Sequence, residues 1–209
     1  CCPSRASILT GQYPHRVGLG HMTTNDLGRP GYRGVVSSDA QTIAQVLAPA
    51  GYRSFISGKW HLGTPDPTQH GFEEFYGTLV SAKTFWDPNH FLRLPRNRVR
   101  REYPAERFYG TDAVTDHAID FLSLAEKTPR RPWFLYLAYN APHTPIQPPK
   151  EWVAKVKQRE QGISDRRAKL VALIEHMDDG IGKVMAKLEE TGLAKNTLVI
   201  FSSDNGGQS

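Results

Sequence analysis

The chain alternates segments of helical periodicity with short apolar segments of strand length, and this alternation constrains its fold more than any other feature. Between Ser164 and Gly192 apolar residues recur at steps of three and four, which predicts one long helix. Shorter helices are expected over residues 111–127 and 41–50. Each expected helix is followed by a strand-length apolar segment, at residues 52–57, 132–138 and 197–203. This order predicts an α/β fold with a mainly parallel sheet sandwiched between helices.

Polar residues follow each expected strand at its carboxyl end, the edge at which parallel sheets bind their ligands. Lys59 and His61 follow the first strand, and His143 follows the second. Asp204 and Asn205 follow the third. An ammonium and an imidazole suit a tetrahedral oxyanion, and a carboxylate beside an amide suits a hard cation. Each position also has a structural explanation, because Asp-Asn-Gly-Gly forms ordinary turns and loop histidines can hydrogen-bond within the fold.

The composition is that of a globular domain, with 39% hydrophobic and 22% charged residues in 209. No segment approaches the roughly 18 consecutive apolar residues of a membrane-spanning helix, so no span is expected. Cys1 and Cys2 are neighbours and cannot form an ordinary disulfide, and no zinc-binding spacing is present. No nucleic-acid-binding pattern accompanies the net charge of +5, so a nucleic-acid partner is not expected.

Two segments carry much of the positive charge, RLPRNRVRRE at residues 93–102 and TPRRP at residues 128–132. The first is either a solvated loop or a surface that attracts an anionic substrate. It lies within residues 64–110, which show little periodicity. We expect residues 64–110 to form a long irregular insertion near the rim of the active site.

The chain begins CCPSRASILTG, which resembles the sulfatase signature Cys-x-Pro-Ser-Arg-x-x-x-Leu-Thr-Gly. Pro3 and Arg5 fix the register, so Cys1 matches the signature cysteine and Cys2 the variable position. GKWHLG, APH and SDNG resemble later blocks of the family in the same order, and the chain looks most like the bacterial arylsulfatase branch. The resemblance implies that residues 1–209 are part of one catalytic domain with the alkaline-phosphatase-like fold, incomplete at both ends.

The resemblance implies hydrolysis of sulfate esters by a formylglycine made from Cys1 after translation. A formylglycine-generating enzyme would be the partner in this maturation, and a sulfated small molecule or glycan would be the substrate. One hydroxyl of the hydrated aldehyde attacks sulfur, and the second then expels sulfate. A bound Ca²⁺, rather than Mg²⁺, would be held by the Cys1 product, Asp204 and Asn205.

The remaining matches take roles by the same resemblance. Arg5 would hold the diol and help anchor the metal site, while Lys59 and His143 would bind sulfate oxygens. His61 would hydrogen-bond the diol and accept the proton whose loss releases sulfate. His143 is also the candidate for protonating the departing alcohol.

The family pattern places an Asp-Asp pair before Cys1 and a sulfate-binding lysine after the SDNG block, and neither lies within this chain. We therefore expect the 209 residues alone to be inactive and poorly stable. By analogy the enzyme would act in the periplasm, outside the cell or in lysosomes. The alternatives are a phosphonate or phosphodiester hydrolase of the same superfamily, and a non-catalytic binder of sulfated glycans using the arginines between Arg96 and Arg101.

Overall fold

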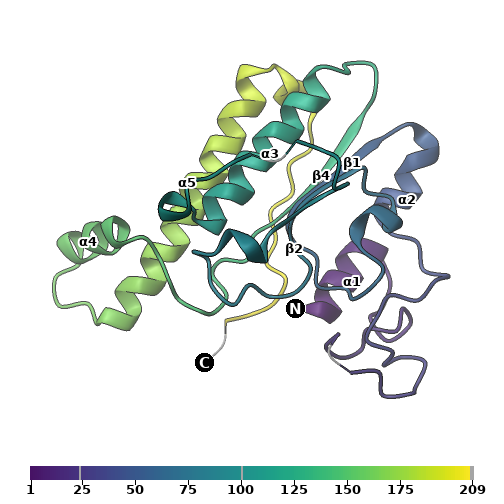
Figure 1. Ribbon diagram of the computed structural model, residues 1–209, viewed down its shortest axis with the longest axis horizontal. Coiled ribbons are helices and arrows are strands. Elements are labelled where there is room, and N and C mark those ends of the chain that lie inside the picture. Colours follow the sequence, from purple (N-terminus) through teal and green to yellow (C-terminus); the bar gives the residue numbers. More distant parts are fainter. Residues whose placement is uncertain (24, 100, 208–209) are drawn as a thin grey trace.

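The computed structural model describes residues 1–23, 25–99 and 101–207, which form a sheet with helices on both faces (Figure 1). Its strands lie side by side in the order β3-β2-β1-β4, and β1 pairs in parallel with both β2 and β4. Only β3 is antiparallel, to β2. The expected α/β fold with a mainly parallel sheet is confirmed. The strands are β1 (Arg53–Lys59), β2 (Glu74–Thr78), β3 (Leu92–Leu94) and β4 (Trp133–Ala138).

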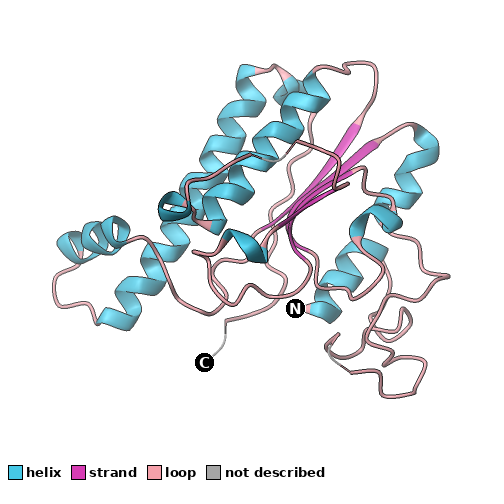
Figure 2. Cartoon of the chain, viewed as in Figure 1, coloured by secondary structure: helices cyan, strands magenta, loops and turns pink. Residues whose placement is uncertain are grey.

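Two layers of helices cover the sheet, and a helical hairpin projects beyond it (Figure 2). Helices α1 (Cys2–Thr10) and α2 (Ile43–Leu47) pack on one face, and α3 (Gly110–Glu126) packs on the other with α5 (Asp165–Glu190). Helix α4 (Lys150–Arg159) and the first turns of α5 form the hairpin. None of the described helices is long and apolar enough to cross a membrane. Short 3-10 helices lie at Ala48–Ala50, Pro67–His70, Pro88–His90, Ala105–Arg107 and Leu193–Asn196.

The core consists of two main clusters because successive strand residues point to opposite faces of the sheet. Phe55 packs toward α3, where its ring stacks on Phe121 with centroids 5.5 Å apart. Its neighbour Ile56 packs with α1 and α2 on the other face. The same alternation separates Phe75 from Tyr76 on β2. Helices therefore bury both faces of β1 and β2, which fixes the orientation of the side chains that follow them.

The helices expected from periodicity are present, with ends where the capping residues predict them. Ser164 accepts a hydrogen bond from the Arg167 backbone at the start of α5, and Gly192 just beyond its end adopts φ 71°. Helix α3 matches its expected range within a residue. Residues 41–50 are less regular, because α2 continues as a 3-10 helix that ends at Gly51 with φ 82°.

The strand predicted at residues 197–203 is wrong. These residues follow α5 as the yellow segment of Figure 1, yet form no strand ladder with any described part of the chain. Leu198, Ile200 and Phe201 are 85%, 79% and 80% exposed, so they are not covered by helices as expected. An apolar, β-branched sequence favours a strand only where a neighbouring strand pairs with it. Within the described residues β4 pairs only with β1.

The expectation that residues 64–110 are irregular is also wrong in part, because β2 and β3 lie within them. All of β2 is buried, and it is a central strand of the sheet. Its sequence, Glu-Phe-Tyr-Gly-Thr, lacks an apolar pattern because it contains a carboxylate and a glycine. Glu74 is nevertheless 3% exposed, and Arg93 and Arg98 pair with its carboxylate. The buried charge is thereby compensated, which hides the strand from a search for apolar residues.

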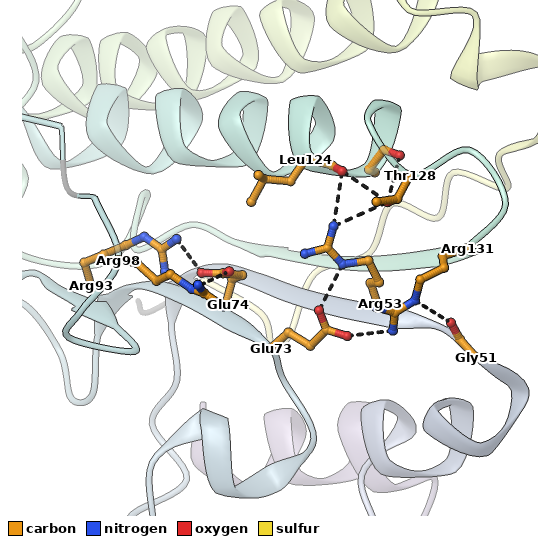
Figure 3. A network of polar contacts seen from close by, with 10 residues as sticks. Gly51, Arg53, Glu73, Glu74, Arg93, Arg98, Leu124, Thr128 and Arg131 are labelled. Carbon is orange, nitrogen blue, oxygen red and sulfur yellow. Dashed lines mark hydrogen bonds and ion pairs between the residues drawn. The ribbon is translucent and has the colours of Figure 1, made fainter.

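The arginine-rich segment lies at the amino ends of the strands, away from the edge that parallel sheets use for ligands (Figure 3). Arg93 and Arg98 contact Glu74, the first residue of β2. Arg101 pairs with Asp120 on α3 at 2.6 Å. These three arginines pair with carboxylates of the chain itself, which favours a role within the fold over attraction of an anionic substrate. Arg98 and Arg101 are exposed, as expected of a solvated loop, whereas the Arg93 side chain is buried. Arg100 lies outside the described residues.

A second ion cluster at the same edge joins β1, β2 and the segment before β4. Arg53 contacts Glu73 at 2.9 Å, and Arg131 contacts the other oxygen of that carboxylate at 2.9 Å (Figure 3). Arg53 also donates to the carbonyl of Leu124 at the end of α3. The amino edge of the sheet is therefore tied together by charge pairs.

Candidate active site

Helix α1 begins at the carboxyl edge of the sheet, and Cys1 and Arg5 lie on the same face of this helix. Cys1 is the N-cap residue, and its carbonyl accepts a hydrogen bond from the Arg5 backbone at 2.9 Å. Residues four apart lie on the same helical face, so the Arg5 guanidinium returns to the Cys1 side chain. Its Nε lies 3.4 Å from the Cys1 Sγ, and its exposed fraction is 5%.

Arg5 also fixes α1 to the end of β1. One terminal nitrogen of the guanidinium donates to the Lys59 carbonyl at 2.7 Å, while Nε lies 3.3 Å from Asp204 Oδ2. This buried cation therefore contacts Cys1, Lys59 and Asp204 together. Residues from the first, second and last of the sequence blocks that resemble the family therefore meet at the Arg5 guanidinium.

His61 faces Cys1 from the loop after β1, with its Nδ1 3.3 Å from the cysteine Sγ. Strand β1 ends at Lys59, the last residue before this loop, and His61 adopts φ 58°. The His61 backbone donates to the Leu79 carbonyl at 3.0 Å, which holds this unusual conformation. Burial, together with the positive charges of Lys59 and Arg5, lowers the pKa of His61 to about 3. The imidazole is therefore neutral at pH 7.

Lys59 is a cation inside the fold, at the last position of β1 and 1% exposed. Its Nζ donates to the Ser81 hydroxyl at 2.7 Å. Burial, and then the charge of Arg5, lowers the pKa of Lys59 to about 8. Ser81 was not among the expected site residues. It lies beyond β2, and because that strand was not predicted, no sequence signal placed Ser81 beside Lys59.

Glycines at the carboxyl ends of the strands allow this close packing. Gly58 has φ 121°, and a Cβ there would collide with the carbonyl of Ala138 on β4. Gly77 has φ 149°, and a Cβ there would collide with the carbonyl of Gly58. Only glycine tolerates both the backbone conformation and the approach. Lys59 therefore extends from a point at which β1, β2 and β4 are held closely together.

Asp204, one of the two expected metal ligands, contacts Arg5 of α1, and Asn205 is the next residue in the chain. The Asp204 side chain is 27% exposed beside Arg5, and the Asn205 amide donates to the Gly206 carbonyl at 2.8 Å. Their oxygens suit Ca²⁺ in kind, but Ca²⁺ takes about six to eight oxygen ligands. Among the described residues no group of three or more His, Cys, Asp or Glu side chains could hold a metal ion. The described residues therefore do not by themselves complete a cation site.

His143 is exposed in the loop that follows β4. Its backbone donates to the Asn140 carbonyl at 3.0 Å, and its Nδ1 lies 2.7 Å from the Thr144 carbonyl. Asn140 was not predicted, and its buried amide donates to Thr78 Oγ1 at 3.2 Å. The Asn140 Oδ1 is buried without a hydrogen-bond partner among the described residues.

Comparisons with known proteins identify the family to which this α/β chain belongs. The family model described as Sulfatase matches residues 1–209. N-acetylgalactosamine-6-sulfatase from Mus musculus is 32% identical over 225 residues and 99% of this chain, and arylsulfatase from Klebsiella aerogenes is 29% identical over 98% of it. The crystal structure of Ps i-CgsB in complex with k-i-k-neocarrahexaose superposes with a TM-score of 0.82 and 29% identity, covering all of this chain. The chain belongs to the sulfatase family.

The chain matches only part of these relatives. It covers 41% of the mouse protein, 56% of the Klebsiella protein and 48% of the Ps i-CgsB chain. The fold of the matched part is the alkaline-phosphatase-like fold of the sulfatases, as expected from the sequence.

Proposed function

We propose that this chain is the nucleophile-bearing part of a sulfuric ester hydrolase that cleaves sulfate esters at Cys1. The observation that carries the proposal is the convergence of His61 Nδ1 at 3.3 Å and Arg5 Nε at 3.4 Å on the Cys1 Sγ, at the carboxyl edge of a parallel sheet. The chain belongs to the sulfatase family, and Cys1 matches the cysteine of the signature that the family resemblance assigns to the nucleophile, which supports the proposal.

Lys59 and Arg5 suit the charge of the proposed substrate. A sulfate monoester carries one negative charge, and two cations in a largely buried site attract it more strongly than they would in water. Lys59 donates to the sulfate oxygens in this proposal, and His143 approaches from the exposed side. Ser81 holds the Lys59 ammonium in position through the 2.7 Å hydrogen bond.

His61 acts as the base in this proposal. Its imidazole is neutral because burial and two nearby cations oppose protonation, and its Nδ1 faces the reacting side chain. Formylglycine at position 1, when hydrated, supplies a hydroxyl nucleophile beside this nitrogen. His61 accepts a proton from that position, and the Arg5 guanidinium holds the reacting group against the helix.

Asp204 and Asn205, with the modified residue 1, would hold Ca²⁺, which supplies Lewis-acid polarisation of the sulfate when bound. Arg5 keeps the Asp204 carboxylate beside residue 1 through the 3.3 Å ion pair. Maturation requires a formylglycine-generating enzyme as a transient partner. The substrate is a sulfated small molecule or glycan.

The test uses the full-length protein co-expressed with a formylglycine-generating enzyme. Hydrolysis rates are compared for 4-nitrophenyl sulfate, 4-nitrophenyl phosphate and a phosphonate ester, with Cys1→Ala as the control and mass spectrometry reporting modification of residue 1. We expect preference for the sulfate ester and loss of activity in Cys1→Ala. Preference for the phosphorus esters would assign the rival hydrolase activity, and activity that survives Cys1→Ala would exclude the proposed nucleophile.

A further inference from the structure

A groove beside the candidate site combines an exposed indole with lysines. Its volume is about 370 Å³. It lies between the loop after β2, the loop after β4 and the helical hairpin of α4 and α5. No residue of the groove belongs to the candidate site described above. Its lining includes Trp86, Ile146, Pro148, Lys150, Val153 and Lys169.

Internal contacts fix the walls of the groove. The Gln147 side-chain oxygen accepts hydrogen bonds from Thr84 Oγ1 at 2.9 Å and from the Phe85 backbone at 3.2 Å, which joins the two loops. The Trp86 ring packs on Tyr109 with centroids 4.5 Å apart, yet the residue is 42% exposed. One part of the indole is therefore anchored while the rest remains available to a ligand.

The hairpin carries an excess of positive charge, and the two charged residues of it that line the groove, Lys150 and Lys169, are both lysines. Residues 150–175 contain seven basic and four acidic side chains. Lys169 pairs with Asp165 at 2.8 Å, but Lys157 pairs with the same carboxylate, so one negative charge serves two lysines. Lys150 is exposed and forms no ion pair with any described residue. An anionic ligand is favoured over a neutral or cationic one.

Chain connectivity places the groove close to the candidate site. Ser81, which contacts Lys59, is five residues from Trp86, and that length of chain spans at most about 18 Å. His143 is three residues from Ile146, a span of at most about 11 Å. These upper bounds place the groove within reach of an oligosaccharide that presents one sulfate to Lys59.

We propose that this groove binds a further sugar residue of a sulfated oligosaccharide, an inference that rests on the proposed sulfatase function. The apolar face of a sugar ring packs on the exposed indole of Trp86, and Lys150 pairs with a sulfate group that is not the one cleaved. A stretch of apolar peptide fits less well, because it would leave Lys150 without a counter-charge. The substrate class is therefore a sulfated glycan chain.

Binding is measured by calorimetry on the full-length Cys1→Ala variant, which keeps the ligand intact. The probes are a carrageenan hexasaccharide and a hexasaccharide bearing N-acetylgalactosamine 6-sulfate, each also in desulfated form. We expect Trp86→Ala to weaken binding of at least one sulfated probe about tenfold, the loss typical of removing an aromatic anchor. Trp86→Phe should restore most of it. Lys150→Gln should weaken binding of the sulfated probe and leave that of the desulfated probe unchanged.

Two matched controls lie outside the groove. Tyr13→Ala removes an aromatic side chain that is 83% exposed, and Lys127→Gln removes an exposed lysine beyond the end of α3. Neither should change binding. The inference is wrong if Trp86→Ala behaves like Tyr13→Ala, if neither sulfated hexasaccharide binds, or if an acidic peptide such as oligoglutamate binds equally well and depends equally on Trp86.

A kinetic measurement separates this inference from the proposed function. In the modified enzyme, Trp86→Ala should change kcat/KM for 4-nitrophenyl sulfate less than about twofold, since a small aryl ester makes no contact with the groove. It should raise KM for the sulfated hexasaccharide that binds. Absence of any sulfatase activity would refute the proposed function, and calorimetry would still report whether the groove binds glycan. An equal loss on both substrates would overturn the inference.

Discussion

Lys59 is a buried ammonium that, among the residues the structure describes, donates a hydrogen bond to one hydroxyl, that of Ser81, and such a residue is expected to weaken the fold that contains it. Burial lowers its pKa to about 8, so at pH 7 the fold carries a charge whose desolvation is incompletely repaid. We expect Lys59→Met to raise the free energy of unfolding by about 1–3 kcal/mol while abolishing hydrolysis of sulfate esters.

Urea denaturation and activity of the full-length variant measure the two effects. Ser81→Ala is the matched control, because it removes the hydroxyl partner of Lys59 and leaves the ammonium. It should lower activity without stabilising the fold. A Lys59→Met variant that is less stable than the parent would show that the lysine contributes to folding and not only to the site.

Individual site residues could be predicted where they lie in sequence blocks that resemble the family. Cys1, Arg5, Lys59, His61 and Asp204 come together through contacts of 2.7 to 3.4 Å. The sequence could not show which second residues support them. Ser81 and Asn140 touch site elements only because strands distant in the sequence lie side by side, and no local pattern reports that proximity.

Helices α3 and α5 pack closely at one glycine, and a second glycine two residues away provides an internal comparison. A Cβ on Gly180 would lie 2.6 Å from Thr115 Oγ1 and 3.0 Å from the Tyr139 hydroxyl, whereas a Cβ on Gly182 would meet nothing within 4 Å. Thr115 is buried and hydrogen-bonded to Tyr139 at 2.8 Å, so it cannot easily move.

The same substitution should therefore have opposite effects at the two positions. We expect Gly182→Ala to stabilise the protein by about 0.5–1 kcal/mol, because alanine favours the helix. Gly180→Ala should destabilise it, since the methyl group forces α3 and α5 apart. Thermal unfolding of both full-length variants measures the shift of Tm relative to the parent protein. Equal shifts of Tm in the same direction would mean that the helix contact at Gly180 does not restrict side-chain size.

Elements were predictable to the extent that their packing leaves a pattern in the sequence. Helices α3 and α5 bury one stripe each, and their periodicity located them within a residue or two. Strand β2 escaped detection because Glu74 and Gly77 interrupt its apolar sequence. The opposite error occurred at residues 197–203, where an apolar sequence without a paired neighbour does not form a strand.

The stability of the whole molecule depends on pH through buried neutral histidines. His117 is 2% exposed and stacked on Tyr76, and burial lowers its pKa to about 4. Burial also lowers the pKa of His70. The unfolded chain binds these protons near pH 6.5, before the folded chain does. Stability contributed by each histidine is therefore complete above about pH 6.5 and is lost as the pH falls, at about 1.4 kcal/mol per unit.

We expect the free energy of unfolding to fall between pH 7.0 and pH 5.5, with His117 contributing about 1 kcal/mol of the loss. His117→Phe keeps an aromatic ring against Tyr76 and removes the titrating group. Urea denaturation at the two pH values should show a smaller decrease for this variant than for the parent protein. If the free energy of unfolding of His117→Phe fell as much as that of the parent protein, folding would not lower the pKa of His117.

At the carboxyl edge, Gly58 and Gly77 leave no space for a side chain and hold the strands that position Lys59. Such a framework restricts how the protein can change under selection for another ester. Variants recovered from a randomised library should keep these glycines and Lys59 and should differ mainly at residues 82–87 and 144–150, the segments that contain Trp86 and Lys150. Adaptation to a different substrate would then proceed by replacing loop residues while the strands that hold the reacting groups remain unaltered.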